Sequence, residues 1–387
     1  MMRRHTVLHV SEFIKGGVAT YLNSLIREQL ADPEFDDVRI IAAREHRRFL
    51  PDVPNDRIIL FDYPQRSITG LRSLNRVLSE TLSDFCPSVI QLTSSFPGAI
   101  GRLNSAVRRL RRLRGDGQRT PVVYCAQGWS FLMDTGVAKR FAYETAERIL
   151  ARWTDRIICI SEHERRGAVE IGIPAEKCDL VYNALPAAPP EPSAVDVPAA
   201  VAEARSRGDR VLLFVGRFDR QKGLDLLSGI FDGDSRRGDI LLAAGSTAVN
   251  SEPVRFGSRM FDVGWSSPGQ IESLLAISDA LMVPSRWEGF GLVAAEAMRA
   301  GRAVICSSRG GLPEVVEHGV TGIVLSSLQP SEIASALNEL SSQRLREMGE
   351  AGRKRFHRLF TIDQLHQATK RVYCTAAEEL CTAPWKF

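Results

Sequence analysis

Short apolar runs alternate with longer amphipathic segments along almost the whole chain, and this alternation limits the possible folds more than any other feature. Strands buried on both faces of a parallel sheet have apolar sequences, whereas the helices between them show apolar residues at helical spacing. The pattern predicts an α/β protein with parallel sheets. The expected strands are Thr6–Val10, Val38–Ala42, Ile58–Phe61, Val89–Leu92, Val122–Cys125, Arg156–Ile160, Asp179–Tyr182, Val211–Val215, Ile240–Ala244, Met260–Val263, Ala280–Val283, Ala303–Cys306 and Gly322–Val324.

A proline-rich segment, Ala184 to Ser193, interrupts this alternation. Proline fixes φ and has no amide proton, so the segment is expected to be a linker without helix or strand. A chain of 387 residues is also longer than a typical single core. We therefore expect two Rossmann-like domains, residues 1–184 and 201–361, joined by a linker at residues 185–200.

Composition places the chain among ordinary globular proteins. With 50 Lys and Arg against 46 Asp and Glu, the net charge of +4 is a mild excess that indicates no particular partner, and we expect no nucleic acid. The seven cysteines have no regular spacing, which is typical of reduced thiols. No apolar run approaches the roughly 18 residues of a membrane-spanning helix. A cytoplasmic protein is expected.

The most informative local pattern runs from Val283 to Met298, where an apolar strand leads into a glycine-broken turn and a helix is expected to begin near Leu292. Such a turn gathers free amide groups and the positive end of a helix dipole, which together favour an anion. Glu288 and Glu296 bracket the turn. Carboxylates on both sides of an anion site can hold hydroxyl groups, so the pattern outlines a nucleotide sugar.

This stretch, with its continuation from Cys306 to Gly322, resembles the Glu-x7-Glu signature of the retaining family 4 (group 1) glycosyltransferases of bacterial exopolysaccharide and lipopolysaccharide synthesis. The resemblance implies the GT-B fold, with two Rossmann-like domains that face each other across a cleft. It also implies that the first domain binds the acceptor and the second binds the nucleotide sugar. A C-terminal helix at residues 362–380 is expected to pack back on the first domain.

Arg217 and Lys222 lie in a glycine-bounded loop, Gly216 to Gly223, that follows the first expected strand of the second domain. Two such cations can clamp a diphosphate, although a loop of this kind taken alone is more often a solvated charged loop. In the family, the Arg and Lys of a Gly-Arg…Lys-Gly loop neutralise the leaving diphosphate, and these two residues match those positions.

Under the same resemblance, Glu288 lies beside the transferred sugar and Glu296 accepts hydrogen bonds from ribose hydroxyls. Gly16 and Gly17 match the glycine loop of the first domain. The residues expected to take part in catalysis are Glu288, Gln127, Arg217 and Lys222. The residues expected to bind the donor are Gly16, Gly17, Arg217, Lys222, Glu288, Gly289, Phe290, Gly291, Leu292, Glu296, Gly264 and Trp265.

One position departs from the family pattern. Many members carry a histidine just before a glycine at the end of a central first-domain strand, whereas this chain has Gln127 before Gly128. Glutamine can offer a carbonyl and an amide to a hydroxyl group, but it cannot titrate. Proton transfer by an imidazole is therefore not expected at this position.

Asp232-Gly233-Asp234 has the form of an Asp-x-Asp metal motif. Both residue types are common in turns, so we interpret the motif as a turn and expect neither a metal nor another cofactor.

The segment from Arg102 to Arg119 is rich in arginine, and its apolar residues recur at helical spacing, which predicts an amphipathic basic helix. A solvated charged face would explain such a pattern. A basic helix can also lie on an anionic membrane surface. Because many relatives act on lipid-linked sugars, the resemblance favours peripheral contact with the inner face of the cell membrane.

The leading hypothesis is a metal-independent, retaining hexosyltransferase that moves a sugar from a nucleotide sugar to a saccharide or lipid-linked saccharide in cell-surface polysaccharide synthesis. A catalytically silent nucleotide-sugar-binding scaffold would keep the same residues, and a sugar-nucleotide epimerase would share the architecture. The epimerase would need a set of acid–base groups around the sugar carbon, and the loops that carry Gly16, Arg217 and Glu288 contain no histidine. A Rossmann dehydrogenase is disfavoured because no Gly-x-Gly-x-x-Gly follows the first strand.

Overall fold

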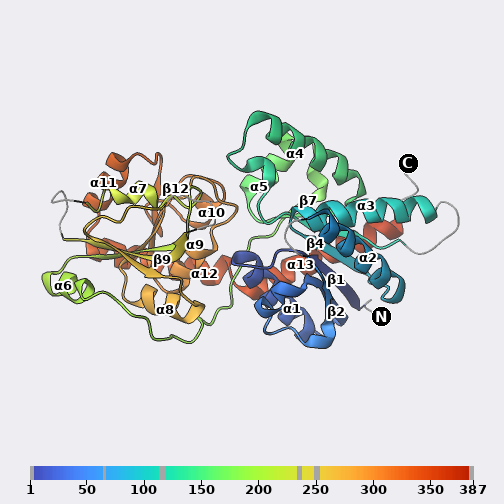
Figure 1. Ribbon diagram of the computed structural model, residues 1–387, viewed down its shortest axis with the longest axis horizontal. Coiled ribbons are helices and arrows are strands. Elements are labelled where there is room, and N and C mark those ends of the chain that lie inside the picture. Colours follow the sequence, from blue (N-terminus) through green and yellow to red (C-terminus); the bar gives the residue numbers. More distant parts are fainter. Residues whose placement is uncertain (1–3, 64–66, 113–118, 233–237, 248–252, 383–387) are drawn as a thin grey trace. The chain divides into compact units, whose positions relative to one another are not determined.

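The computed structural model describes residues 4–63, 67–112, 119–232, 238–247 and 253–382. The chain divides into two compact units (Figure 1). Unit 1 extends to Leu185 and includes the chain from Ile362 onward, and unit 2 is Pro186–Thr361. No helix or strand lies between Leu180 and Ala200. None of the described helices is both long and apolar enough to cross a membrane.

Unit 1 is built on a seven-stranded parallel sheet with the strand order β3-β2-β1-β4-β5-β6-β7. Its strands are β1 (His5–Ser11), β2 (Phe35–Ala43), β3 (Ile58–Phe61), β4 (Val89–Thr93), β5 (Val122–Cys125), β6 (Arg156–Cys159) and β7 (Cys178–Leu180). The central strands are apolar and buried because helices cover both faces of the sheet. The order reverses between β1 and β4, which is where an open α/β sheet binds ligands.

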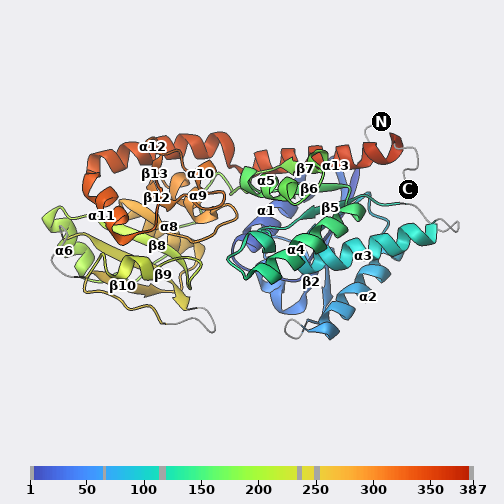
Figure 2. The same cartoon turned by 90° about the horizontal axis from the view of Figure 1, so that it is seen from above.

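The first five α-helices of unit 1 follow its strands in the usual crossover arrangement, and the sixth belongs to the chain that returns from unit 2. They are α1 (Gly17–Ala31), α2 (Ile68–Asp84), α3 (Ser95–Arg112), α4 (Val137–Leu150), α5 (Glu162–Glu170) and α13 (Ile362–Thr382), with short 3-10 helices η1 (Arg44–Phe49), η2 (Asn55–Arg57), η3 (Ser130–Leu132), η4 (Ala151–Trp153) and η5 (Ala175–Lys177). Helices α1 and α13 lie against one face of the sheet, and α2 and α3 lie against the other (Figure 2).

A buried chain of hydrogen bonds joins α13 to the sheet of unit 1. The His9 ring Nε2 lies 2.7 Å from Gln29 Oε1, and Gln29 Nε2 donates to the Tyr373 hydroxyl at 3.2 Å. Tyr373 in turn donates to Gln91 Oε1, and Gln91 Nε2 donates to the Tyr21 hydroxyl at 2.9 Å. Burial lowers the pKa of His9 to about 4, so the ring is neutral and the chain carries no charge. Each of these side chains is hydrogen-bonded to another member of the chain, which fixes α13 to the sheet.

Unit 2 contains a six-stranded parallel sheet with the order β10-β9-β8-β11-β12-β13. The strands are β8 (Val211–Phe218), β9 (Ile240–Thr247), β10 (Met260–Gly264), β11 (Ala280–Val283), β12 (Ala303–Ser307) and β13 (Gly322–Leu325). The helices are α6 (Ala200–Arg207), α7 (Asp225–Ser228), α8 (Pro268–Ala276), α9 (Leu292–Arg299), α10 (Leu312–Val315), α11 (Pro330–Glu339) and α12 (Ser342–Leu359). Here the order reverses between β8 and β11.

The predicted α/β class is confirmed, and each expected strand overlaps an observed one. The agreement has a simple cause. Both sheets are parallel and buried, so their strands are continuous apolar runs that stand out from the amphipathic helices.

Candidate functional site

Two loops of unit 2 leave the sheet at its strand-order reversal, one after β8 and the other after β11. Neighbouring strands at a reversal send their connections in opposite directions, which opens a crevice at the carboxyl edge of the sheet. The first loop carries Arg217 and Lys222, and the second carries Glu288 and leads into α9. The topology therefore brings together three of the predicted site residues.

Lys222 and Glu288 form an ion pair between these two loops. The Lys222 Nζ lies 2.6 Å from Glu288 Oε2, and the side chains are 19% and 12% exposed. The Ser285 hydroxyl donates to the same carboxylate oxygen at 3.3 Å. A partly buried, charge-assisted contact of this kind is stronger than a surface ion pair. It places an ammonium and a carboxylate at the reversal point with a small part of each still open to solvent.

Further contacts fasten the β8 loop to the β11 loop. The Arg286 amide donates to the Gln221 carbonyl at 2.8 Å, and Gln221 Nε2 donates to the Trp287 carbonyl at 3.2 Å. The Arg286 guanidinium binds both oxygens of Asp225, at 2.8 and 2.6 Å, and this bidentate contact ties the second loop to α7. The two loops therefore form one structural element.

Arg217 takes no part in the Lys222 contact. Its Nε lies 2.9 Å from Asp219 Oδ2, and its Nη2 donates to Gln221 Oε1 at 2.7 Å. The side chain is 57% exposed, so it can move to an incoming anion at little cost. Asp219 also accepts a hydrogen bond from the backbone amide of Lys222 at 3.0 Å. It therefore contacts both cationic residues and stabilises the loop between them. Sequence reasoning missed Asp219, which carried no signal beyond its place between them.

Two glycines allow the loops to approach this closely. Gly310 has φ +62, and a Cβ built there would lie 1.6 Å from the Glu288 carbonyl oxygen. Gly223 has φ +75, and its Cβ would lie 2.2 Å from the Pro284 carbonyl oxygen. Both neighbours are backbone atoms that cannot move aside, so glycine is required on steric as well as conformational grounds.

The turn between Gly289 and Leu292 places the start of α9 beside Glu288. Gly291 caps the helix in the left-handed conformation, and no side chain occupies the cap. The amides of the first turn are thus available to an anion. Phe290 is buried, where its ring contacts that of Phe360 at 5.5 Å between centroids, so it anchors the turn.

Glu296 lies one turn into α9 and is half-buried. Desolvation raises its pKa to about 7; Arg299 opposes this rise, and Glu272 of α8 adds to it. Arg299 itself contacts Glu272 at 3.3 Å. A carboxyl group with a pKa near neutrality is poised to change its charge when a ligand binds.

Gly264 and Trp265 lie at the carboxyl end of β10, an edge strand that β9 separates from β8. Trp265 is 72% exposed. These residues share the carboxyl edge with the two loops, but no contact joins them to Lys222 or Glu288 among the described residues.

The remaining predicted residues belong to unit 1. Gly16 has φ +54 and caps α1, and Gly17 is the first residue of that helix. Gln127 follows β5 and has φ +56, while Ser94 follows the neighbouring β4 and has φ +78. Positive φ is costly for residues other than glycine, and such residues cluster at functional sites. Ser94 was not predicted, because nothing in its sequence context indicates the strained backbone.

Gln127 is paired with Asn183, which was also not predicted from the sequence. Asn183 Nδ2 donates to Gln127 Oε1 at 2.9 Å, and Gln127 Nε2 donates to Asn183 Oδ1 at 3.2 Å. Beneath them, burial raises the pKa of the Cys125 thiol to about 12, so this cysteine is not a nucleophile.

Three arginines of the segment from Arg102 to Arg119 are engaged inside unit 1 and do not form the solvent-facing basic surface that the sequence suggested. Arg102 is completely buried, with its Nη1 2.7 Å from Glu147 Oε2 and its guanidinium 3.9 Å from the centre of the Tyr124 ring. An isolated buried charge is unfavourable, so Arg102 requires both partners. The expectation is wrong here because the charged residue is on the inner face of the helix.

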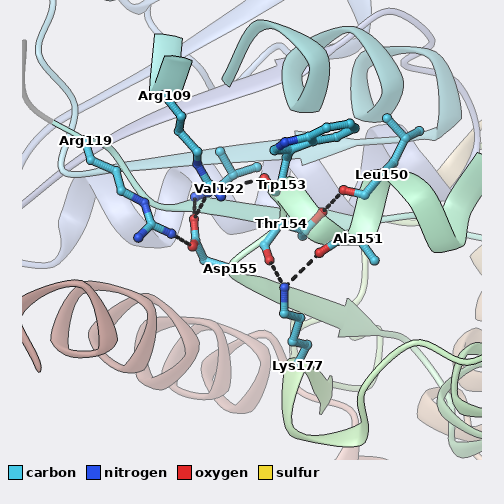
Figure 3. Close-up of polar contacts among 9 residues, drawn as sticks. All are labelled: Arg109, Arg119, Val122, Leu150, Ala151, Trp153, Thr154, Asp155 and Lys177. Atoms are coloured by element: carbon cyan, nitrogen blue, oxygen red, sulfur yellow. Dashed lines mark hydrogen bonds and ion pairs between the residues drawn. The ribbon is translucent and has the colours of Figure 1, made fainter. Parts of the chain in front are cut away.

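Arg109 and Arg119 are likewise engaged inside unit 1, as Figure 3 shows. Both guanidinium groups donate hydrogen bonds to Asp155, and the one from Arg109 is 2.9 Å long. Asp155 also accepts a hydrogen bond from the Val122 amide at 2.8 Å. Nearby, Lys177 donates to the Ala151 and Thr154 carbonyls, each at 2.8 Å, at the end of α4. This cluster holds β5, β6 and α4 together and pairs the charges of Arg109 and Arg119 with that of Asp155. Arg114 lies outside the described residues.

Gly233 and Asp234 of the Asp-Gly-Asp turn also lie outside the described residues. Within the part of the chain that the structure describes, no group of three or more His, Cys, Asp or Glu residues could hold a metal ion.

Comparisons with known proteins cover most of the chain. Residues 200–355 match the family described as "Glycosyl transferases group 1", and residues 16–184 match "Glycosyl transferase 4-like domain". A 41.2 kDa protein in the cps region of Klebsiella pneumoniae is 32% identical over 90% of this chain and 93% of its own length. The D-inositol 3-phosphate glycosyltransferase of Corynebacterium aurimucosum is 34% identical over 37% of this chain and 38% of its own length.

Solved structures with a similar fold cover nearly the whole chain. Anabaena HepE, in complex with UDP and glucose, has a TM-score of 0.74 and 17% identity, with 96% of this chain and all of that chain covered. The sucrose-phosphate synthase of Thermosynechococcus elongatus has a TM-score of 0.76 and 20% identity, with 98% and 100% covered. These likenesses establish the GT-B fold for this chain.

The contact between Gly310 and Glu288 generates a first prediction. An alanine in the left-handed conformation costs roughly 1–2 kcal/mol, and Gly310→Ala should lower the free energy of unfolding by more than this because its methyl group also clashes with the Glu288 backbone. The displacement of Glu288 should weaken nucleotide binding at least about tenfold. Gly301→Ala is the matched control. Gly301 has φ +69, but its Cβ would lie no closer than 3.9 Å to Arg353. Thermal unfolding and calorimetric titration with UDP, GDP and ADP measure both effects; equal behaviour of the two variants would contradict the prediction.

The raised pKa of Glu296 generates a second prediction. Between its ordinary pKa of 4.5 and about 7, the folded protein binds more protons at this site than the unfolded chain, so stability falls as pH rises through this window. Glu296→Gln should remove the loss and stabilise unit 2 by about 2–3 kcal/mol at pH 8 but little at pH 5. Scanning calorimetry at both pH values tests this, with the exposed Glu339→Gln as control. A stabilisation that does not depend on pH would refute the assignment.

Proposed function

Because this chain belongs to the group 1 glycosyltransferases and has the GT-B fold, we propose that it transfers a hexose from a nucleotide sugar to a saccharide or lipid-linked saccharide acceptor, with retention of the anomeric configuration. The observation that carries the proposal is the Lys222–Glu288 contact at the strand reversal of unit 2, beside the start of α9. The cps region named for the Klebsiella pneumoniae relative favours a role in cell-surface polysaccharide synthesis.

The proposed mechanism assigns the cationic groups to the leaving diphosphate. When a nucleotide sugar binds, its diphosphate competes with Glu288 for the Lys222 ammonium, and the exposed Arg217 adds a second cation. The first amides of α9 donate to the same oxygens. These groups are fixed before the reaction, so they stabilise the charge that develops on the leaving group with little reorganisation.

The carboxylates are assigned to the sugar and the ribose. Glu288, released from Lys222, accepts a hydrogen bond from a hydroxyl of the transferred sugar and stabilises positive charge near the reacting carbon. Glu296 accepts hydrogen bonds from the ribose hydroxyls. Gln127 has no titratable proton, so it contributes a hydrogen bond to the sugar and leaves proton transfer to the acceptor and the departing phosphate. No residue in this scheme requires a metal ion.

A donor screen tests this function. We expect the purified chain to release UDP, GDP or ADP slowly from one member of a panel of nucleotide sugars. Glu288→Gln should lower that rate at least about a hundredfold, since it removes a charge aimed at the reacting carbon. The control is Glu339→Gln, which should have no effect. Glu339 is exposed and accepts a hydrogen bond from the Ser335 hydroxyl. Nuclear magnetic resonance of the first product should show the anomeric configuration of the donor.

The alternatives give different results in the same screen. A silent nucleotide-sugar-binding scaffold would bind a nucleotide without releasing it from any donor. An epimerase would convert the donor sugar into its epimer, and the same spectra would show a new nucleotide sugar. A chain that binds no nucleotide would refute the proposed function.

The proposal includes contact with an anionic membrane surface, but by a different face of α3 from the one the arginines suggested. Leu103, Val107 and Leu110 are 48%, 48% and 65% exposed and share the outer face of the helix. An apolar outer stripe favours shallow insertion between lipid headgroups over electrostatic attraction.

Vesicle flotation tests the membrane contact. The chain should float with vesicles of phosphatidylethanolamine and phosphatidylglycerol, and the double variant Leu103→Glu with Leu110→Glu should lose this binding. Val320→Glu in unit 2, a residue with 47% exposure, is the control and should still float. Unchanged flotation of the double variant would show that α3 is not the contact.

A further inference from the structure

Gln127 and Asn183 form a reciprocal pair in which two hydrogen bonds from one carboxamide hold the other. The residue that is held, Gln127, has a strained backbone conformation. Gln127 is partly exposed at the carboxyl end of β5, and its φ of +56 is one that glutamine rarely adopts. Asn183 is 3% exposed and follows β7, 56 residues farther along the chain. The pair therefore brings together the ends of two strands that β6 separates.

We infer that Asn183 is a positioning residue for sugar transfer: it holds the Gln127 carboxamide in one orientation, with the oxygen free to accept a hydrogen bond from a sugar hydroxyl. The inference rests on the proposed function. Asn183 is buried and acts through Gln127, so it is not itself assigned a contact with the substrate.

The count of hydrogen-bonding groups supports this orientation. The amide nitrogen of Gln127 has two protons, one directed to Asn183 Oδ1 at 3.2 Å and the other to Cys125 Sγ at 3.4 Å. Its oxygen accepts one bond, from Asn183, and keeps a second lone pair. The group that Gln127 offers to a substrate is therefore its amide oxygen, which can accept a hydrogen bond from a substrate hydroxyl.

A double-mutant cycle tests the inference with the nucleotide-release assay. Asn183→Ala should lower the turnover rate at least about tenfold and leave the nucleotide Kd unchanged, because the predicted nucleotide site is in unit 2. Gln127→Ala should lower turnover to a similar degree. If Asn183 acts through Gln127, the double variant should be no slower than Gln127→Ala alone. Additive losses, or an Asn183→Ala variant with normal turnover, would overturn the inference.

Ser88→Ala is the matched control for lost, partly buried hydrogen bonds. Ser88 exchanges bonds with Thr6 at 2.9 Å at the opposite, amino edge of the same sheet. This variant should lose stability and keep the turnover of its folded fraction. If Asn183→Ala behaves in the same way, its role is structural and the inference fails.

A direct measurement separates this inference from the proposed function. In nitrogen-edited spectra, the side-chain amide protons of Gln127 should exchange slowly with solvent in the wild-type chain, and they should exchange at least about tenfold faster in Asn183→Ala. Rapid exchange of these protons in the wild type would overturn the positioning role even if the chain is an active transferase. An inactive wild type with a fixed Gln127 amide would refute the proposed function, and the catalytic part of the inference with it.

Discussion

The reversal of strand order between β8 and β11 is the constraint on which the site of unit 2 depends. Without it, the loops after these strands would not open a crevice in which Lys222 and Glu288 meet. Two positive-φ glycines, Gly223 and Gly310, then let the loop backbones approach to a distance that any side chain would prevent. The ion pair, the close backbone contacts and the start of α9 are consequences of one topological feature.

Unit 1 uses a different device at its own carboxyl edge. Gln127 lies there among neutral partners: it is paired with an asparagine and donates to a protonated thiol. Neutral networks that are fully satisfied hold side chains in one arrangement without the desolvation cost of a buried ion pair. The loops of unit 2 are therefore joined by an ion pair, whereas Gln127 of unit 1 is held by neutral groups.

The helix α3 shows how a sequence pattern can identify a helix and still mislead about its surface. Helical spacing of leucines and arginines predicted an amphipathic helix, and the helix is present. The pattern could not show which face is buried, because the partners that neutralise Arg102 and Arg109 are Glu147 and Asp155, distant in sequence. A buried carboxylate can draw an arginine inward and leave leucines outside.

The sequence by itself determined the fold class, the strands of both sheets and the loops that carry Arg217, Lys222 and Glu288, because these features are written in local periodicity, in glycine placement and in a family pattern. Only the tertiary structure decided the Lys222–Glu288 contact, the Gln127–Asn183 pair and the raised pKa of Glu296. Each of these joins groups from separate strands or helices, or depends on the burial of a carboxylate. Such relations arise from packing in three dimensions, which no local window of sequence contains.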